Sequence, residues 1–446
     1  MPASFSTSLL TDMYELTMLD ATLRSGVAER QCVFELFGRR LPASRRFGVV
    51  AGTGRILEAL ERFTFDSDDI EWLREQQIVS DLALDYLESF RFTGNIWGYA
   101  EGECYFAGSP LLTVEGTFAQ CTLLETLLLS ILNHDCAVAS AASRMTIAAH
   151  GRPCMDMGAR RAHERAAVSA ARAAVIGGFA GTSNLEAAKR YGIKPIGTAA
   201  HAFTLIHDGE RQAFDAQIAL LGSDTTLLVD TYNVTEGVRH AVEAARATGH
   251  ELGAVRLDSG DLVAQAFTVR GQLDAMGATS TKITVTSDLD EYAIAALGAA
   301  PVDSYGVGTK LVTGSGVPTA ALVYKVVLRE GSDGNMYPVA KKSQSKSTVG
   351  GRKWAGRVLD SEGYASEEVL ISADSESSAR AKLEELGARP LQIPLVTRGR
   401  INTDLWGPQA LQQAQEHHIR SRNELPYHAW RLSEGEAAIP TRYLAL

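Results

Sequence analysis

The middle of the chain alternates between short apolar runs and longer stretches in which apolar residues recur with helical spacing. A short apolar run bounded by polar residues is typical of a buried strand, and the longer pattern predicts an amphipathic helix. The predicted strands cover residues 153–157, 195–197, 226–229, 253–255, 282–285 and 302–305. The predicted helices between them cover residues 168–176, 183–190, 238–247, 262–276 and 291–297. This alternation predicts a parallel α/β sheet with crossover helices, and it is compatible with a closed barrel or an open sheet.

The two ends of the chain have a different pattern, in which strands follow one another with turns between them. Near the N-terminus we predict a helix that Thr11 or Asp12 caps and that stops at Gly26. The other predicted elements are strands at 32–37 and 47–50, acidic helices at 68–76 and 81–90, a small antiparallel sheet within 94–118, and a helical region at 120–150. Towards the C-terminus they are strands at 322–328 and 337–340, a basic loop at 341–353, and helices at 377–386 and 408–422.

These patterns predict two domains. The pattern changes near residue 119 and again near residue 325, which separates an α+β part, residues 1–118 and about 325–446, from an α/β domain, residues 119–324. A chain of 446 residues that is 45% hydrophobic is long enough for two cores.

Charge and cysteine content narrow the classes of function. The formal net charge of −10 gives no indication of nucleic-acid binding, which needs clustered positive charge. The five cysteines are scattered without a CxxC pair, so we expect reduced, buried thiols in a cytoplasmic protein. The first residues do not have the pattern of a signal peptide, and the apolar run at 123–132 contains Glu125 and is too short to cross a bilayer. We therefore expect no membrane partner.

Uncommon polar residues follow each predicted strand of the middle region. In order along the chain they are Gly158, Arg160, Arg161, His163 and Glu164; Thr198 and His201; Asp230, Thr231, Tyr232 and Asn233; Arg256, Asp258, Ser259, Gly260 and Asp261; Thr286, Ser287 and Asp288; and Gly306, Gly308, Thr309 and Lys310. In a closed α/β barrel the carboxyl ends of the strands share the face that carries the active site. We therefore expect these side chains to lie close together.

The residue types point to a phosphorylated substrate, a metal ion and a small anion. Glycines after a strand let backbone N–H groups approach a phosphate, and arginine binds phosphate or carboxylate through two hydrogen bonds. Asp230, Asp258 and Asp288 are carboxylates of the kind that bind Mg²⁺ together with substrate phosphates. Each cluster alone also has a structural interpretation: Asp258–Asp261 as a turn and helix cap, Gly306 and Gly308 as a tight turn.

Several motifs in this order resemble those of the nicotinate phosphoribosyltransferases. They are Thr11-Asp12-Met13-Tyr14, Phe34-Glu35-Leu36-Phe37, Met155-Asp156-Met157-Gly158-Ala159-Arg160-Arg161, Gly181-Thr182-Ser183-Asn184, Gly197-Thr198-Ala199-Ala200-His201-Ala202-Phe203 and Arg256-Leu257-Asp258-Ser259-Gly260-Asp261. The resemblance covers about residues 10–357. It implies that residues 119–324 form an irregular α/β barrel and that about 325–446 complete the N-terminal domain, which is therefore built from both chain ends. It also implies a homodimer with shared active sites.

The resemblance also implies an activity. Such an enzyme converts nicotinate and phosphoribosyl pyrophosphate into nicotinate mononucleotide and pyrophosphate with Mg²⁺, and it consumes ATP through a phosphorylated histidine.

Roles for individual residues follow from the same resemblance. His201 takes the place of the phosphorylated histidine, and Asp258 acts with it as a catalytic residue. Tyr14 stacks on the pyridine ring from the partner subunit, Arg256 lies by the ring, and Arg160 reaches the ribose phosphate. Gly306 and Gly308 hold the 5′-phosphate, and Asp258 and Asp288 are the metal ligands we expect. Thr198, Asp230, Thr309 and Ser183 complete the expected set of substrate-binding residues.

The main alternative is a nicotinamide phosphoribosyltransferase. Those enzymes carry an aspartate in the position of Ser183, where a carboxylate favours the amide and repels the acid. A quinolinate phosphoribosyltransferase is a weaker alternative because that family is shorter and lacks the histidine motif. An aldolase-like barrel needs a lysine at a strand end, and only Lys310 has such a place. A non-catalytic relative is disfavoured because His201, Asp258 and Asp288 are all present.

Overall fold

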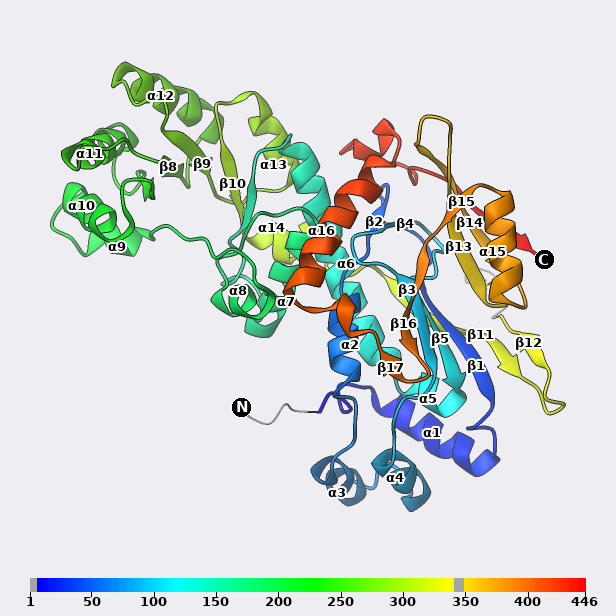
Figure 1. The fold of residues 1–446 in the computed structure, drawn as a ribbon. Coiled ribbons are helices and arrows are strands. Elements are labelled where there is room, and N and C mark those ends of the chain that lie inside the picture. The colour runs from blue at the N-terminus through cyan, green and yellow to red at the C-terminus, as the bar shows by residue number, and fades with distance from the viewer. Residues whose placement is uncertain (1–5, 341–348) are drawn as a thin grey trace. The chain divides into compact units, whose positions relative to one another are not determined.

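The computed structural model describes residues 6–340 and 349–446 (Figure 1). It divides the chain into two compact units, one formed by residues 1–140 with 317–446 and the other by residues 141–316. Residues 341–348 of the predicted basic loop lie outside the described residues.

The first unit is built from both ends of the chain. Its helices are α1 (Met13–Ser25), α2 (Thr53–Leu60), α3 (Ser67–Glu75), α4 (Asp81–Glu88), α5 (Phe118–Thr122), α15 (Glu376–Glu385) and α16 (Gly407–Asn423), and α6 (Glu125–Ala148) continues from it into the second unit. Its strands are β1 (Gln31–Gly38), β2 (Gly48–Val49), β3 (Asn95–Tyr99), β4 (Cys104–Tyr105), β5 (Leu112–Thr117), β11 (Leu322–Glu330), β12 (Met336–Pro338), β13 (Lys353–Leu359), β14 (Ala365–Ser372), β15 (Ala388–Pro390), β16 (Gln392–Thr397), β17 (Arg400–Ile401) and β18 (Thr441–Ala445).

A seven-stranded sheet in the order β12-β11-β1-β5-β3-β16-β17 forms the centre of this unit. β1 pairs antiparallel with β11 and with β5, so residues nearly 300 apart in sequence share one ladder, as in the pair Cys32 and Arg329. Every residue of β1 after Gln31 is buried, which explains its apolar run. A second sheet, β15-β13-β14-β18, contains the C-terminal strand.

The second unit contains the strand–helix alternation. Its helices after α6 are α7 (Glu164–Ile176), α8 (Leu185–Tyr191), α9 (His201–Leu205), α10 (Glu210–Leu221), α11 (Val234–Ala247), α12 (Leu262–Ala275), α13 (Glu291–Ala296) and α14 (Thr309–Val312). Its strands are β6 (Cys154–Asp156), β7 (Thr226–Leu228), β8 (Ala254–Leu257), β9 (Lys282–Val285) and β10 (Ser304–Val307). Helix α11 packs against both α10 and α12, and the three helices lie beside these strands (Figure 1).

The five strands form one parallel sheet in the order β6-β10-β9-β8-β7. Single parallel bridges extend it from Asp156 to Thr182 and from Thr182 to Pro195. The predicted α/β fold with a parallel sheet is thus confirmed. Among the described residues no ladder joins Pro195 to β7, so closure of the barrel stays a prediction.

The cysteines and the long central helix can also be compared with expectation. All five cysteines are buried and free. The helical stretch Phe118–Ala148 is longer than the apolar run at 123–132, and by length and composition it could cross a membrane. However, 67% of its most apolar segment is buried inside the protein, and the core helix of a soluble protein can have the same length and composition.

Candidate active site

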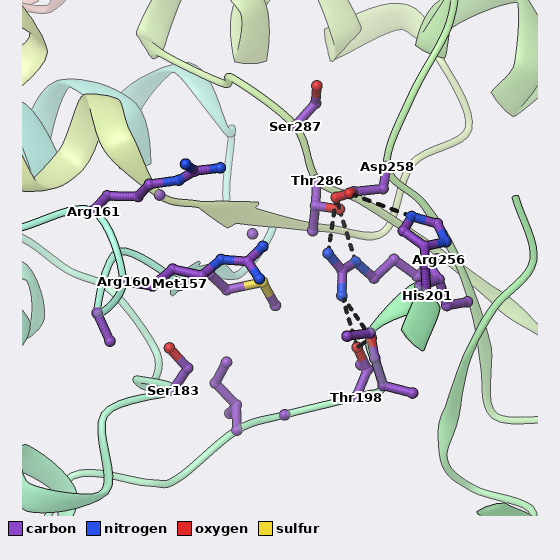
Figure 2. Close-up of a pocket in the computed structure, with 18 of the residues that line it drawn as sticks. Met157, Arg160, Arg161, Ser183, Thr198, His201, Arg256, Asp258, Thr286 and Ser287 are labelled. Atoms are coloured by element: carbon purple, nitrogen blue, oxygen red, sulfur yellow. Dashed lines mark hydrogen bonds and ion pairs between the residues drawn. The ribbon is translucent and has the colours of Figure 1, made fainter. Parts of the chain in front are cut away.

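A cavity of about 490 Å³ lies at the carboxyl ends of the parallel strands in the second unit (Figure 2). The residues that line it come from the ends of β7, β8 and β10, from the loops after β6, β8, β9 and β10, from the loop before α8, and from the segment around Pro195 up to the start of α9. Ten of the predicted site residues are among them: Arg160, Ser183, Thr198, His201, Arg256, Asp258, Asp288, Gly306, Gly308 and Thr309. The expectation that strand-end side chains lie close together is thus met for residues spread over 150 positions of sequence.

Arg256, in β8, is the most fully hydrogen-bonded side chain of the cavity. Its Nε donates to Thr286 Oγ1 (2.8 Å), its Nη1 to Thr198 Oγ1 (2.9 Å) and its Nη2 to Asp258 Oδ1 (2.8 Å). The Thr286 hydroxyl also donates to Asp258 Oδ1. Because these bonds fix the guanidinium plane, Arg256 presents a preset orientation to a ligand.

Asp258 is held as an ionised carboxylate by the same contacts. Burial raises its pKa, but the hydrogen bonds from Thr286 and Arg256 outweigh burial and hold the pKa below its usual range. The side chain is 28% exposed, so its second oxygen remains accessible to a ligand.

His201 begins α9 and lies between two carboxylates. Its Nδ1 is 3.0 Å from Thr231 Oγ1, and its Nε2 is 4.0 Å from both Asp230 Oδ1 and Asp258 Oδ2. Its side chain is 41% exposed. Carboxylates beside an imidazole stabilise the positive charge that the ring acquires when one of its nitrogens is protonated or modified.

Arg160, Arg161 and Ser183 lie on the side of the cavity opposite Arg256 and His201 (Figure 2). Both arginines are exposed, and neither guanidinium forms a hydrogen bond or ion pair with a described residue. The cavity thus offers two free cations to an anionic ligand, whereas Arg256 is balanced by Asp258.

Comparisons with known proteins point to one family over most of the chain. The family profile described as the nicotinate phosphoribosyltransferase (NAPRTase) N-terminal domain matches residues 9–133, and that of the nicotinate phosphoribosyltransferase (NAPRTase) family matches residues 153–347. The chain is 54% identical over 442 residues to the nicotinate phosphoribosyltransferase pncB1 of Mycobacterium tuberculosis, covering 97% of this chain and 94% of that protein. It is 38% identical over 370 residues to the nicotinate phosphoribosyltransferase of Bacillus subtilis, covering 81% and 75% of the two chains.

This chain belongs to the nicotinate phosphoribosyltransferase family. The solved structure of human nicotinic acid phosphoribosyltransferase has the same fold, with a TM-score of 0.81 at 24% identity and coverage of 98% and 97%. A structure described as nicotinate-nucleotide pyrophosphorylase from Pyrococcus furiosus gives a TM-score of 0.75 at 25% identity, with coverage of 94% and 95%.

Asp230 lies next to His201 and the Asp258 loop, outside the lining of the cavity. Its Oδ2 accepts hydrogen bonds from the Asp258 backbone N–H and the Ser259 hydroxyl (both 2.9 Å). Its Oδ1 is buried and has no hydrogen-bond partner among the described residues, and it lies 4.0 Å from His201 Nε2. Asp230 therefore supports the cavity and is not itself among the residues that line it.

Some of the strand-end residues cap helices and do not face the cavity. Asp261 is the N-cap of α12 and accepts the Ala264 N–H, and Asn233 caps α11 in the same way. Gly306 does not form the tight turn that the structural interpretation predicts: it lies within β10, where a Cβ would come within 2.6 Å of Thr286 and 2.7 Å of Met157. Gly308 and Thr309 follow β10 and begin α14 on the cavity wall.

Tyr14 lies in the first unit, on α1, and is not among the residues that line the cavity. Its side chain is 43% exposed. The neighbouring Leu9, Leu10 and Met13 are exposed as well. Burial and the carboxylate of Glu125 raise the pKa of Tyr14 to about 12, so the phenol is neutral at physiological pH.

Four residues that support the cavity received no role from the sequence. Thr286 and Thr231 were visible as strand-end residues, but a threonine gives no signal of its own that it orients an arginine or a histidine. Asp156 and Thr182 stand inside family motifs, and their mutual hydrogen bond depends on the fold.

Proposed function

We propose that this protein transfers the phosphoribosyl group of phosphoribosyl pyrophosphate to nicotinate, giving nicotinate mononucleotide and pyrophosphate. The observation that carries the proposal is the cavity itself. In a chain of this family it gathers a fixed arginine–aspartate pair, a histidine flanked by carboxylates, and two free arginines around about 490 Å³.

The reaction needs a cavity that positions the two substrates and neutralises the charge of the departing pyrophosphate, and it does not need a group that removes a proton from nicotinate. The pyridine nitrogen of nicotinate is already a nucleophile and needs no general base. The glycosidic C–O bond breaks with oxocarbenium-like character at the ribose, so the protein must hold both substrates in line and stabilise the departing pyrophosphate. Arg160 and Arg161 are the free cations available for these phosphates.

A magnesium ion, when bound, supplies further positive charge at the departing pyrophosphate. No group of three or more metal-binding side chains occurs in the described part of the chain. Asp258 and the exposed Asp288 both line the cavity, and a pair of carboxylates fits Mg²⁺, which takes its remaining ligands from substrate phosphates and water. We therefore propose Asp258 and Asp288 as the protein ligands.

We propose in addition that ATP phosphorylates His201. A ring nitrogen attacks the γ-phosphorus of ATP, ADP leaves, and water later cleaves the phosphohistidine to release phosphate. Asp230 and Asp258 are placed to stabilise the charged imidazole. Asp258 lies beside His201 and accepts a hydrogen bond from Arg256. Phosphorylation of His201 therefore alters the surroundings of both side chains in the cavity that binds the sugar donor.

Ser183 favours the acid over the amide. It lines the cavity near the free Arg160 and carries no charge, so the carboxylate of nicotinate meets a hydroxyl and a cation there. A nicotinamide phosphoribosyltransferase would place a carboxylate at this position.

We also propose a cytoplasmic homodimer in which Tyr14 of one subunit closes the site of its partner. Five free, buried cysteines suit a reducing compartment. The exposed apolar side chains around Tyr14 suit a surface that a second subunit covers.

The test is a direct assay of the purified protein with nicotinate, phosphoribosyl pyrophosphate and Mg-ATP. We expect nicotinate mononucleotide, with ADP formed alongside it. Omitting ATP separates transfer from ATP coupling, and nicotinamide in place of nicotinate tests the choice of base. Failure to form the mononucleotide with ATP present would contradict the proposal.

A further inference from the structure

Asp156 is the last residue of β6, and only 1% of its surface is exposed. Its Oδ1 accepts a hydrogen bond from the Gly158 backbone N–H (2.8 Å), and its Oδ2 accepts one from the Thr182 hydroxyl (2.6 Å). Its backbone carbonyl accepts the Ser183 N–H (2.8 Å). One buried residue therefore joins the loop after β6 to the segment that carries Ser183.

This carboxylate has no cation beside it in the described part of the chain. The groups that act on it are the Thr182 hydroxyl and the Gly158 N–H, and burial works against its charge. A buried carboxylate without a counter-ion depends on its hydrogen bonds. Loss of either partner would leave an oxygen of Asp156 buried and unpaired.

The loop after β6 is tightly held at Gly158. A Cβ added there would lie 2.3 Å from Val312 Cγ1, and the Arg161 N–H donates to the Gly158 carbonyl (2.8 Å). Arg160 extends into the cavity from this turn (Figure 2). Its position therefore depends on where Asp156 anchors Gly158.

The opposite segment is held in the same way. The Thr182 hydroxyl donates to Asp156 and accepts the Asn184 N–H (3.0 Å), and Asn184 in turn caps α8. Ser183 lies between these two anchored residues and faces the cavity.

We propose that Asp156 is a positioning residue that sets the distance between Arg160 and Ser183. It is not among the residues that line the cavity, so it acts on substrate only through these two side chains. The inference rests on the proposed function, because Arg160 and Ser183 are the groups expected to receive the substrates' anionic groups.

The decisive variants cut the contact from both sides without changing its shape. In Asp156→Asn the amide oxygen still accepts from Gly158, but the new NH2 cannot accept the Thr182 hydroxyl proton and can only donate to an oxygen that already accepts the Asn184 N–H. Thr182→Val removes that hydroxyl. We expect each to raise the KM for nicotinate about tenfold while kcat changes less than about threefold, as for loss of one hydrogen bond to a charged group in a binding contact. Thr182→Ser keeps the hydroxyl and should restore the wild-type KM.

A double-mutant cycle with Ser183→Ala separates positioning from general loosening of the fold. If Asp156 acts through Ser183, Asp156→Asn should raise KM by clearly less in the Ser183→Ala background than in the wild type. The matched control is Asp303→Asn, because Asp303 anchors the Ile283 N–H (2.7 Å) at the other end of the strands. That variant should alter melting temperature at most, with KM unchanged.

An unchanged KM in both Asp156→Asn and Thr182→Val, or fully additive effects in the cycle, would overturn the role of Asp156. These outcomes require an active wild-type enzyme. A wild-type protein that forms no nicotinate mononucleotide would instead contradict the proposed function.

Discussion

His201 is the residue on which ATP coupling depends. His201→Ala should abolish label transferred from γ-labelled ATP, and the wild-type label should be acid-labile and base-stable, as a phosphoramidate is. Basal transfer without ATP should survive, because the bond changes at the ribose do not involve the imidazole. The measurement is protein-bound radioactivity after acid and base treatment, alongside mononucleotide formation with and without ATP.

His207→Ala is the control for this experiment. His207 lies just beyond α9 and bonds the Phe203 carbonyl (2.7 Å), so it is a nearby histidine outside the cavity lining. Label that persists in His201→Ala and disappears in His207→Ala would reassign the phosphorylated residue.

Ser183 carries the choice between acid and amide. Ser183→Asp should place a carboxylate beside that of nicotinate, and two unit charges about 4 Å apart repel by roughly 4 kcal/mol at an intermediate dielectric. Even half of that would lower kcat/KM for nicotinate more than tenfold, since about 1.4 kcal/mol is one decade. Nicotinamide is neutral and should lose less, or gain.

The quantity to compare is the ratio of kcat/KM for nicotinate to that for nicotinamide. Ser183→Asn is the matched control, because it adds similar bulk without charge. A ratio that moves equally in both variants would show that size rather than charge acts at this position.

At the scale of elements, the parallel sheet was predictable because each short strand leaves a compact apolar run. The prediction of 282–285 coincides with β9, and the ends of the other four strands differ from the prediction by at most two residues. The strand at 195–197 appears only as a single bridge at Pro195. This bridge is made by the Lys194 carbonyl and the Ile196 N–H, and Pro195 itself has no N–H to donate to a strand on its other side.

The elements that the sequence pattern did not predict depend on partners distant in sequence. The strands of the β15-β13-β14-β18 sheet draw their register from pairs such as Glu368 with Thr441. Arg357 lies in β13, fully buried, and donates to Glu103 (2.7 Å) and Glu368 (3.2 Å). From its sequence alone, a charged residue is expected at the surface, and one of the two buried carboxylates that pair with Arg357 lies 254 positions away.

Helix α1 provides a stability prediction. Glu15 has no exposed surface, and burial raises its pKa to about 7 although Thr11 and Thr126 donate hydrogen bonds to it. The folded state therefore holds a proton that the unfolded chain releases above the ordinary pKa of 4.5. Consequently this residue makes the protein less stable as pH rises from about 4.5 to about 7, and the loss is complete above that range.

Glu15→Gln removes the titrating group and keeps an acceptor for the Thr126 N–H (2.8 Å). We expect it to raise the free energy of unfolding by about 1 kcal/mol at pH 8. This is less than the pKa shift alone would give, because solvent next to the exposed Tyr14 screens the charge of Glu15. The gain should vanish as pH falls towards 4.5. Melting temperature at several pH values measures it, with the exposed Glu29→Gln as control. A gain that is the same at every pH would mean that Glu15 is not protonated in the folded state.

Across the whole molecule, the sequence predicted ten of the residues that line the cavity of the second unit, but not that Asp230 lies outside the lining, nor the contacts that orient the lining residues. Strand-end position was enough to bring Arg160, His201, Arg256 and Asp258 together, because parallel strands share one carboxyl edge. The orientation of Arg256 depends on Thr198 and Thr286, which come from two other strand ends. Such cross-strand bonds follow from sheet order, β9 beside β8, which apolar patterning does not specify.

In the proposed dimer, each active site contains residues from both subunits. Tyr14 belongs to the first unit and Arg160 to the second, and we propose that they meet across a dimer interface. Tyr14→Ala and Arg160→Ala homodimers should each lose most activity, because every site carries a lesion. In a hybrid dimer one site receives both lesions and the other receives neither. Hybrids purified through two different tags should therefore regain about half of the wild-type activity per dimer, the share expected for one intact site of two. Co-expression of Arg160→Ala with a second tagged copy of Arg160→Ala is the control and should stay inactive. If each site were built within one chain, every site of the hybrid would still carry one lesion, and verified hybrids would be as inactive as the parents.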